Sequence, residues 1–106
     1  MAVELLFGFP AGSIAATVDS VSAALGVNFE IHDSLWRGGE YYVYEAGSEK
    51  IIIQRNNDGG PPEEPAEEAF PSYPLLMYMD SAHRKERTEQ LLKCSSHPVL
   101  LRSTGD

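Results

Sequence analysis

The sequence predicts an α+β fold, with a mainly antiparallel sheet of about five to six strands, two helices packed on one face, and the order β-α-β-β-β-β-α-β. Short apolar or alternating runs indicate the strands, and two segments with helical spacing or charge indicate the helices. The chain has 106 residues, of which 42% are hydrophobic and 23% are charged. This mixture is typical of globular proteins, and a chain of this length forms one core, so residues 1–106 are expected to be a single domain.

The N-terminal quarter predicts a buried strand followed by a helix. Residues 3–9, "VELLFGF", are almost continuously apolar, as in a buried strand. Ser13 is placed to cap a helix, and Gly26 is placed to end it. Apolar residues at spacings of 4, 3 and 4 mark its expected buried face: Ile14, Val18, Val21 and Leu25. Thr17 is expected to lie outside that face.

The middle of the chain predicts three further strands. Residues 27–34 alternate apolar and polar side chains, which indicates a strand with Val27, Phe29 and Ile31 facing inward. Strands over residues 40–45 and 50–55, joined by a tight connection, form a predicted hairpin.

The C-terminal third predicts a strand, a helix and a last strand. The strand covers about 74–79, and Asp80 or Ser81 is expected to cap the helix within "AHRKERTEQLLKCS". Pro98 limits that helix, and "VLLRS" then reads as a short strand. Two βα units around a hairpin also fit a ferredoxin-like arrangement, although no sequence repeat supports a duplication.

An acidic, Pro-rich loop is predicted at about 56–72, "NNDGGPPEEPAEEAFPS". Its four prolines disfavour helix and central strand, and it carries five of the negative charges: Asp58, Glu63, Glu64, Glu67 and Glu68. Loops of this length are usually either functional or disordered. Two interpretations stay open, a solvated connection and an electrostatic arm toward a basic partner. Pairing within the molecule, with Arg84, Lys85 and Arg87 of the second helix, would weaken the latter.

The charge balance restricts the partners. Sixteen acidic and eight basic residues give a formal net charge of −8, which repels nucleic acid and anionic membranes and favours a basic protein. Cys94 is the single cysteine, so no intramolecular disulfide is possible and a reducing, cytoplasmic location is expected. The apolar N-terminus lacks the basic region of a signal peptide, and no apolar run reaches the length of a membrane span.

The sequence contains no complete catalytic or nucleotide-binding motif. His32, Asp33 and Ser34 are the residue types of a hydrolase triad, but they are adjacent, whereas such groups converge from separate elements. Cys94 and His97 allow a thiolate–imidazole pair, although Cys94 follows Leu91 at helical spacing and is better explained as a core residue. The three histidines are scattered, so neither a metal site nor a cofactor is expected.

Aromatic residues cluster on the predicted hairpin and the turn before it. Tyr42 and Tyr44 should project to one face of the strand, with Tyr41 on the other. Tyr, Trp and Arg are enriched at the centres of protein interfaces, which favours a binding surface here. The alternative is that the tyrosines cover the sheet against a helix.

The segments "WRGGEYYVYEAG" and "EKIIIQRNND" resemble the hairpin of small bacterial immunity proteins, which neutralise the toxins of contact-dependent and polymorphic toxin systems. The resemblance implies a non-enzymatic, cytoplasmic protein that binds a cognate toxin domain, with no shared catalytic residues. The expected contact residues are Asp33, Trp36, Arg37, Glu40, Tyr42, Tyr44, Glu63, Glu64, Glu67 and Glu68. The alternatives are a small hydrolase or transferase using Cys94 or His32, or a small regulatory ligand-binding domain. The sequence leaves the oligomeric state open.

Overall fold

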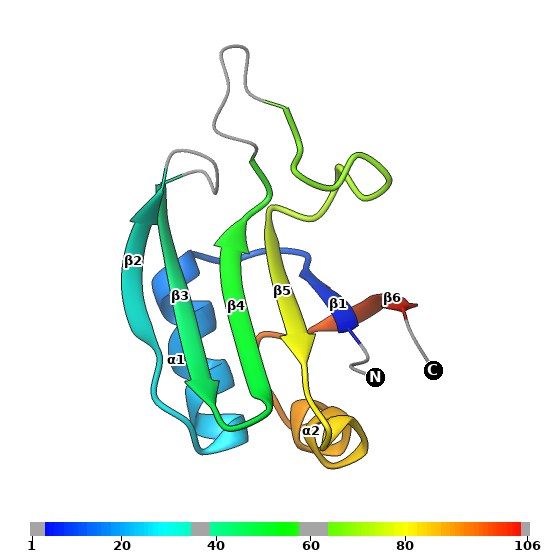
Figure 1. Ribbon diagram of the computed structural model, residues 1–106. Coiled ribbons are helices and arrows are strands. Elements are labelled where there is room, and N and C mark those ends of the chain that lie inside the picture. Colours follow the sequence, from blue (N-terminus) through cyan, green and yellow to red (C-terminus); the bar gives the residue numbers. More distant parts are fainter. Residues whose placement is uncertain (1–3, 35–38, 58–63, 105–106) are drawn as a thin grey trace.

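A computed structural model describes residues 4–34, 39–57 and 64–104 (Figure 1). Within these residues six strands form one antiparallel sheet with two helices, which confirms the predicted fold class and element order. The elements are β1 (Glu4–Phe9), α1 (Ile14–Leu25), β2 (Glu30–Ser34), β3 (Gly39–Ala46), β4 (Glu49–Arg55), β5 (Leu75–Asp80), α2 (Arg84–Leu91) and β6 (Val99–Thr104).

The strand order β2-β3-β4-β5-β1-β6 shows how the chain builds the sheet. β1 and β4 are connected through α1 and the inserted β2–β3 hairpin, and β5 lies between them in the sheet. β5 and β6 are connected through α2, and β1 lies between them. These are two split βαβ units, so β4, β5, β1 and β6 have the ferredoxin-like arrangement that the sequence allowed. The β2–β3 hairpin lengthens this sheet at one edge (Figure 1).

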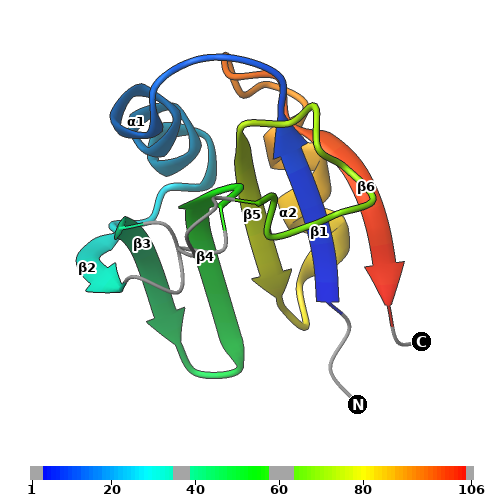
Figure 2. The same cartoon turned by 90° about the horizontal axis from the view of Figure 1, so that it is seen from above.

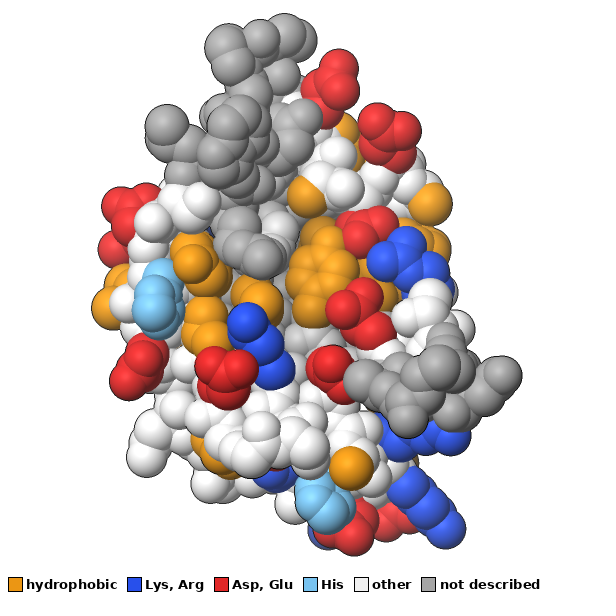
Figure 3. Space-filling view, in the orientation of Figure 1, with side chains coloured by type: hydrophobic (Ala, Val, Ile, Leu, Met, Phe, Trp, Pro, Cys, Tyr) orange, Lys and Arg blue, Asp and Glu red, His pale blue; other side chains and the backbone are white. Residues whose placement is uncertain are grey.

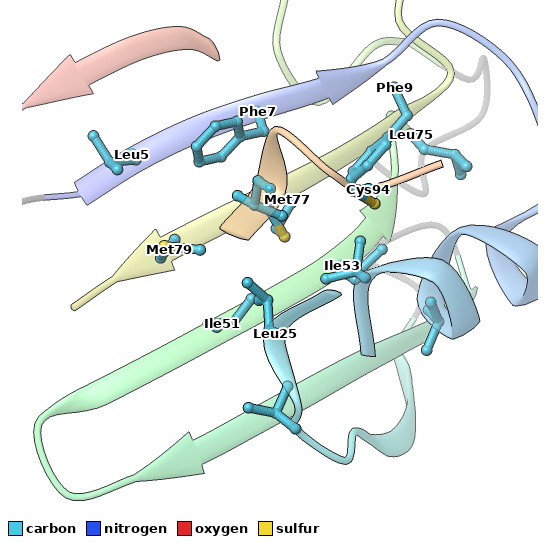
Figure 4. Packing of buried hydrophobic residues seen from close by; sticks show 14 of the residues in the cluster. Leu5, Phe7, Phe9, Leu25, Ile51, Ile53, Leu75, Met77, Met79 and Cys94 are labelled. Carbon is cyan, nitrogen blue, oxygen red and sulfur yellow. The ribbon is translucent and has the colours of Figure 1, made fainter. Parts of the chain in front are cut away.

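The hydrophobic core lies between the sheet and the helices (Figure 4). Alternate residues of β1, β4 and β5 point into it, as the two-residue period of a strand requires. The helices supply the four predicted apolar residues of α1 together with Leu91 of α2, and Cys94 is buried in the same cluster, as expected. Because α1 and α2 contribute to one cluster, they pack on the same face of the sheet.

The caps of α1 are those that the sequence predicts. The Ser13 hydroxyl accepts a hydrogen bond from the Ala16 N–H at 3.2 Å, and Gly26 ends the helix with a left-handed φ of 68°. Thr17 was expected outside the buried face, but it is only 1% exposed. It lies one turn before Val21, so the buried stripe is wider than the apolar residues alone indicate.

Two details of the other elements differ from expectation. Ile31 shares the inward face of the sheet with Tyr42 and Ile53, as predicted, but it is 56% exposed, because β2 is an edge strand of the sheet and few neighbours cover it. α2 was expected to be capped by Asp80 or Ser81, but His83 is its N-cap residue and makes no side-chain cap bond. The Ser81 hydroxyl, two residues before the cap position, instead accepts from the His83 N–H and donates to the buried Glu49 carboxylate at 2.7 Å.

Candidate partner-binding surface

The sheet face opposite the helices has two halves. Over β5, β1 and β6 it is crossed by the segment 64–73, the second part of the acidic loop (Figure 2). Over β2, β3 and β4, no helix or loop among the described residues forms a second layer. This uncovered half carries half-buried side chains such as Tyr41, Val43 and Ile52.

Glu67 attaches the acidic loop to the sheet. Its carboxylate accepts two hydrogen bonds from the Arg102 guanidinium, at 3.0 and 3.1 Å, and one from the Tyr78 hydroxyl at 2.6 Å. These bonds from Arg102 and Tyr78 outweigh the effect of burial and lower the pKa of Glu67. Burial and the carboxylate together raise the pKa of Tyr78 well above its ordinary value. Glu67 therefore binds two residues of the sheet in the same molecule, Arg102 and Tyr78.

Asn56, at the end of β4, holds both ends of the loop together. Its amide group donates to the carbonyls of Phe70 and Tyr73, each at 2.9 Å, and accepts from the Glu67 N–H at 3.0 Å. Its backbone N–H donates to the Pro74 carbonyl. The described part of the loop is therefore neither a free arm nor a loosely solvated connection.

Glu67→Gln is expected to loosen the loop. The neutral amide loses the ion pair with Arg102, so the backbone amides of Phe70 and Tyr73 should exchange hydrogen faster, and the phenol pKa of Tyr78 should fall toward its usual value. Hydrogen exchange and an ultraviolet pH titration measure the two effects. Glu68→Gln, an exposed neighbour, is the matched control. Unchanged exchange in Glu67→Gln would show that Asn56 holds the loop alone.

Of the other loop carboxylates that were expected to contact a partner, two differ from Glu67 in their exposure. Glu64 and Glu68 are exposed, whereas Glu63 falls outside the described residues. The prediction that Arg87 pairs with the acidic loop is wrong, because Arg87 binds Glu49 on the other side of the molecule. Glu67 of the loop pairs instead with Arg102 of β6.

The hairpin places its aromatic residues on both faces. Tyr42 and Tyr44 share a face with Ile53 and Ile51 and pack, half-buried, against the core. This agrees with the alternative prediction that these tyrosines cover the sheet on its helix side. Tyr41 projects to the uncovered face and stacks on His32, with ring centroids 5.5 Å apart and an interplanar angle of 25°. Trp36 and Arg37 lie outside the described residues. Whether Tyr42 and Tyr44 also meet a partner stays a prediction.

Exposed carboxylates line the β2–β3 edge, and we call this set the acidic edge: Glu30, Asp33, Glu40 and Glu45. Asp33 and Glu40 stand directly opposite each other in the β2–β3 ladder and project to the helix side of the sheet, whereas Glu30 and Glu45 project to the uncovered face. Like charges in that position are destabilising. The described residues of β2 and β3 contain no Lys or Arg, whereas α2 and the turn after it carry exposed Arg84, Lys85 and Lys93. The charge is therefore unevenly distributed over the molecule.

A hollow of about 490 Å³ opens on the uncovered face. Val43 lies at its centre, with Ile52 and Tyr41 beside it and Glu30 and Glu45 at its sides. Figure 3 shows apolar side chains in the middle of this face, with acidic groups beside them. An apolar and aromatic centre with a charged rim is the usual composition of a protein interface.

A buried ion pair, which no local sequence pattern indicates, holds α2 to the sheet. Arg87 donates to both carboxylate oxygens of Glu49, at 2.6 and 2.7 Å, and to the Leu25 carbonyl at 2.9 Å. The Glu49 side chain is 6% exposed and that of Arg87 is 15% exposed. The bond from Arg87 lowers the pKa of Glu49, and the carboxylate raises the pKa of Arg87.

The side chains considered for catalysis do not converge. Cys94 is buried on the helix face, where its thiol lies 3.0 Å from the Ser20 hydroxyl. His97 is exposed and contacts Cys94 through its backbone N–H. His32 lies on the opposite face of the sheet, 3.7 Å from Glu30.

Within residues 4–34, 39–57 and 64–104, no three or more His, Cys, Asp or Glu side chains form a group suited to a metal ion. In the same residues, no helix has the length and apolarity needed to cross a membrane.

No protein-family model matches this chain, and no curated protein is significantly similar to it in sequence.

Proposed function

We propose that this chain is a non-enzymatic binding module of immunity type, which binds a basic toxin domain in the bacterial cytoplasm and blocks its active site. The observation that carries the proposal is the uncovered half of the sheet, where two carboxylates of the acidic edge, Glu30 and Glu45, flank the apolar centre around Tyr41 and Val43. Apolar and aromatic side chains supply affinity at the centre of an interface, and surrounding charges speed the encounter with an oppositely charged partner.

The pair formed by Asp33 and Glu40 supports a basic partner. Two exposed carboxylates directly opposite each other repel, although the nearby Arg55 guanidinium, which donates to the Glu40 carbonyl at 3.2 Å, offsets part of this repulsion. A cationic partner would neutralise this repulsion on binding. The single cysteine agrees with a reducing compartment.

The double variant Asp33→Asn/Glu40→Gln tests this proposal, because it should affect stability and binding in opposite directions. Its free energy of unfolding should stay unchanged or rise by a few tenths of a kcal/mol, while its association rate with the toxin domain should fall about tenfold at low salt. Stopped-flow association over a series of salt concentrations measures the rate, and chemical denaturation measures the stability.

Glu86→Gln/Glu89→Gln is the matched control, since it removes two exposed carboxylates from α2. If the control slows association as much as the hairpin variant does, only the net charge matters and the acidic edge is not the contact surface.

A further inference from the structure

The hollow on the uncovered face is built from three cross-strand rows. His32 pairs with Tyr41 in the first row, and Glu30, Val43 and Ile52 form the second. Glu45 pairs with Lys50 in the third. Valine is the shortest side chain of this set, so the longer side chains around Val43 form walls, and the floor is apolar.

One wall of the hollow is aromatic. Tyr41 lines it, and stacking on His32 at 5.5 Å restricts the orientation of the tyrosine ring. A tyrosine ring attracts a cation within about 6 Å of its centroid, and planar guanidinium groups also stack on such rings.

Two carboxylates flank the floor. The Glu30 side chain is 84% exposed, and His32 is 3.7 Å away. Glu45 is the diagonal cross-strand neighbour of Glu30 across Val43, a position that separates the two residues by roughly 7–8 Å. A cationic group above Val43 can therefore contact both carboxylates.

Lys50 also lines the hollow, but its charge is offset by its neighbours. It stands between Glu45 on β3 and Asp80 on β5. Together with Glu30, this part of the face carries three carboxylates and one lysine, so it stays negative. Charge complementarity thus selects a cationic occupant.

We propose that the hollow is the anchor site for an arginine side chain of the protein partner. The aliphatic stem would cover Val43 and Ile52, the guanidinium would stack on Tyr41, and its N–H groups would donate to Glu30 and Glu45. Arginine fits better than lysine, because its rigid planar fork both stacks and bonds two acceptors. This inference rests on the proposed function and names the chemistry of the contact.

A short peptide tests the site without the partner. The probes are the blocked peptide acetyl-Gly-Arg-Gly-amide and its counterparts with citrulline, a neutral isostere of arginine, or with lysine. At pH 7.5 and low salt, the arginine peptide should shift the amide resonances of β2 and β3 around the hollow in a saturable way. The lysine peptide should bind at least about threefold more weakly, and the citrulline peptide should not bind.

The variant Glu30→Gln/Glu45→Gln should weaken binding of the arginine peptide about five- to tenfold, as expected for two exposed ion pairs. Glu86→Gln/Glu89→Gln is the control with the same charge change, and it should leave this affinity unchanged. Equal binding of the citrulline peptide, or equal weakening in the control, would overturn the inference.

The same variants in the intact complex separate this inference from the proposed function. A toxin complex that forms with equal affinity in Glu30→Gln/Glu45→Gln would refute the arginine anchor and leave the immunity function standing. Specific peptide binding in the hollow, with no toxin complex, would support the anchor site and refute the immunity function.

Discussion

Replacing Glu49 with glutamine is expected to lower the free energy of unfolding by about 3–5 kcal/mol, the usual cost of breaking a buried ion pair. The Arg87 guanidinium would keep its buried position while losing two charge-assisted hydrogen bonds, to oxygens 2.6 and 2.7 Å away. Ser81 and the Arg87 Nε–H group share one carboxylate oxygen, and the single carbonyl of glutamine can replace only one of the two carboxylate oxygens. Denaturant unfolding followed by circular dichroism measures the change, with Glu89→Gln on the exposed side of α2 as the control.

The same pair predicts the direction of the acid response. The pKa of Glu49 is lowered on folding from an ordinary value of 4.5, so its contribution is fully present above that value and is lost as the pH falls through the folded pKa. The native protein should therefore lose stability below about pH 4.5, and Glu49→Gln should lose less over that interval. A loss of under 1 kcal/mol in the variant at pH 7, with an unchanged acid response, would contradict the importance of this pair.

Gly8→Val is expected to destabilise the protein by about 1–3 kcal/mol, although strand propensity alone predicts a gain of up to about 1 kcal/mol. A Cβ atom at Gly8 would lie 2.6 and 2.7 Å from ring atoms of Tyr73 and 2.8 Å from a methyl group of Leu101. The Leu101 methyl can rotate away, but the Tyr73 ring can move only if the acidic loop moves with it. Overpacking therefore outweighs propensity at this position.

A double-mutant cycle identifies the cause. On a Tyr73→Ala background the ring is absent, so Gly8→Val should cost much less or become stabilising, and the coupling energy should exceed about 1 kcal/mol. Thermal unfolding and hydrogen exchange of the Phe70 amide follow stability and loop attachment. Equal costs with and without the Tyr73 ring would show that the ring does not lie on Gly8.

Most of the fold could be predicted because local patterns determine its elements. The stripe from Ile14 to Leu25, with Ser13 and Gly26 at its ends, defines α1 without reference to the rest of the chain. The connection between β3 and β4 is likewise determined by its own residues, and Gly47 there adopts a left-handed φ of 60°. The exposure of Ile31 could not be predicted in this way. The sheet order decides whether a strand is covered, and the alternation of apolar and polar residues carries no information about that order.

The candidate site could be predicted only in part, because its contacts join residues far apart in sequence. Glu40 belongs to the predicted hairpin and Asp33 to the strand predicted before it, and their exposure agrees with the expected contact surface. The anchoring of Glu67 by Arg102 depends on β6 lying beside β1, which no local pattern shows. Asn56 looked like an ordinary loop residue, and only the folded structure shows that it bonds to three backbone groups.

The most direct test of the immunity function is to co-express this chain with the C-terminal domain of the protein encoded immediately upstream, and to score host survival and co-elution on a sizing column. We expect this domain to be toxic alone, the chain to restore growth, and the two to elute as one complex. Asp33→Asn/Glu40→Gln should then slow the formation of that complex. A toxic domain that kills the host despite folded, soluble expression of this chain, with no complex on the column, would contradict the immunity function.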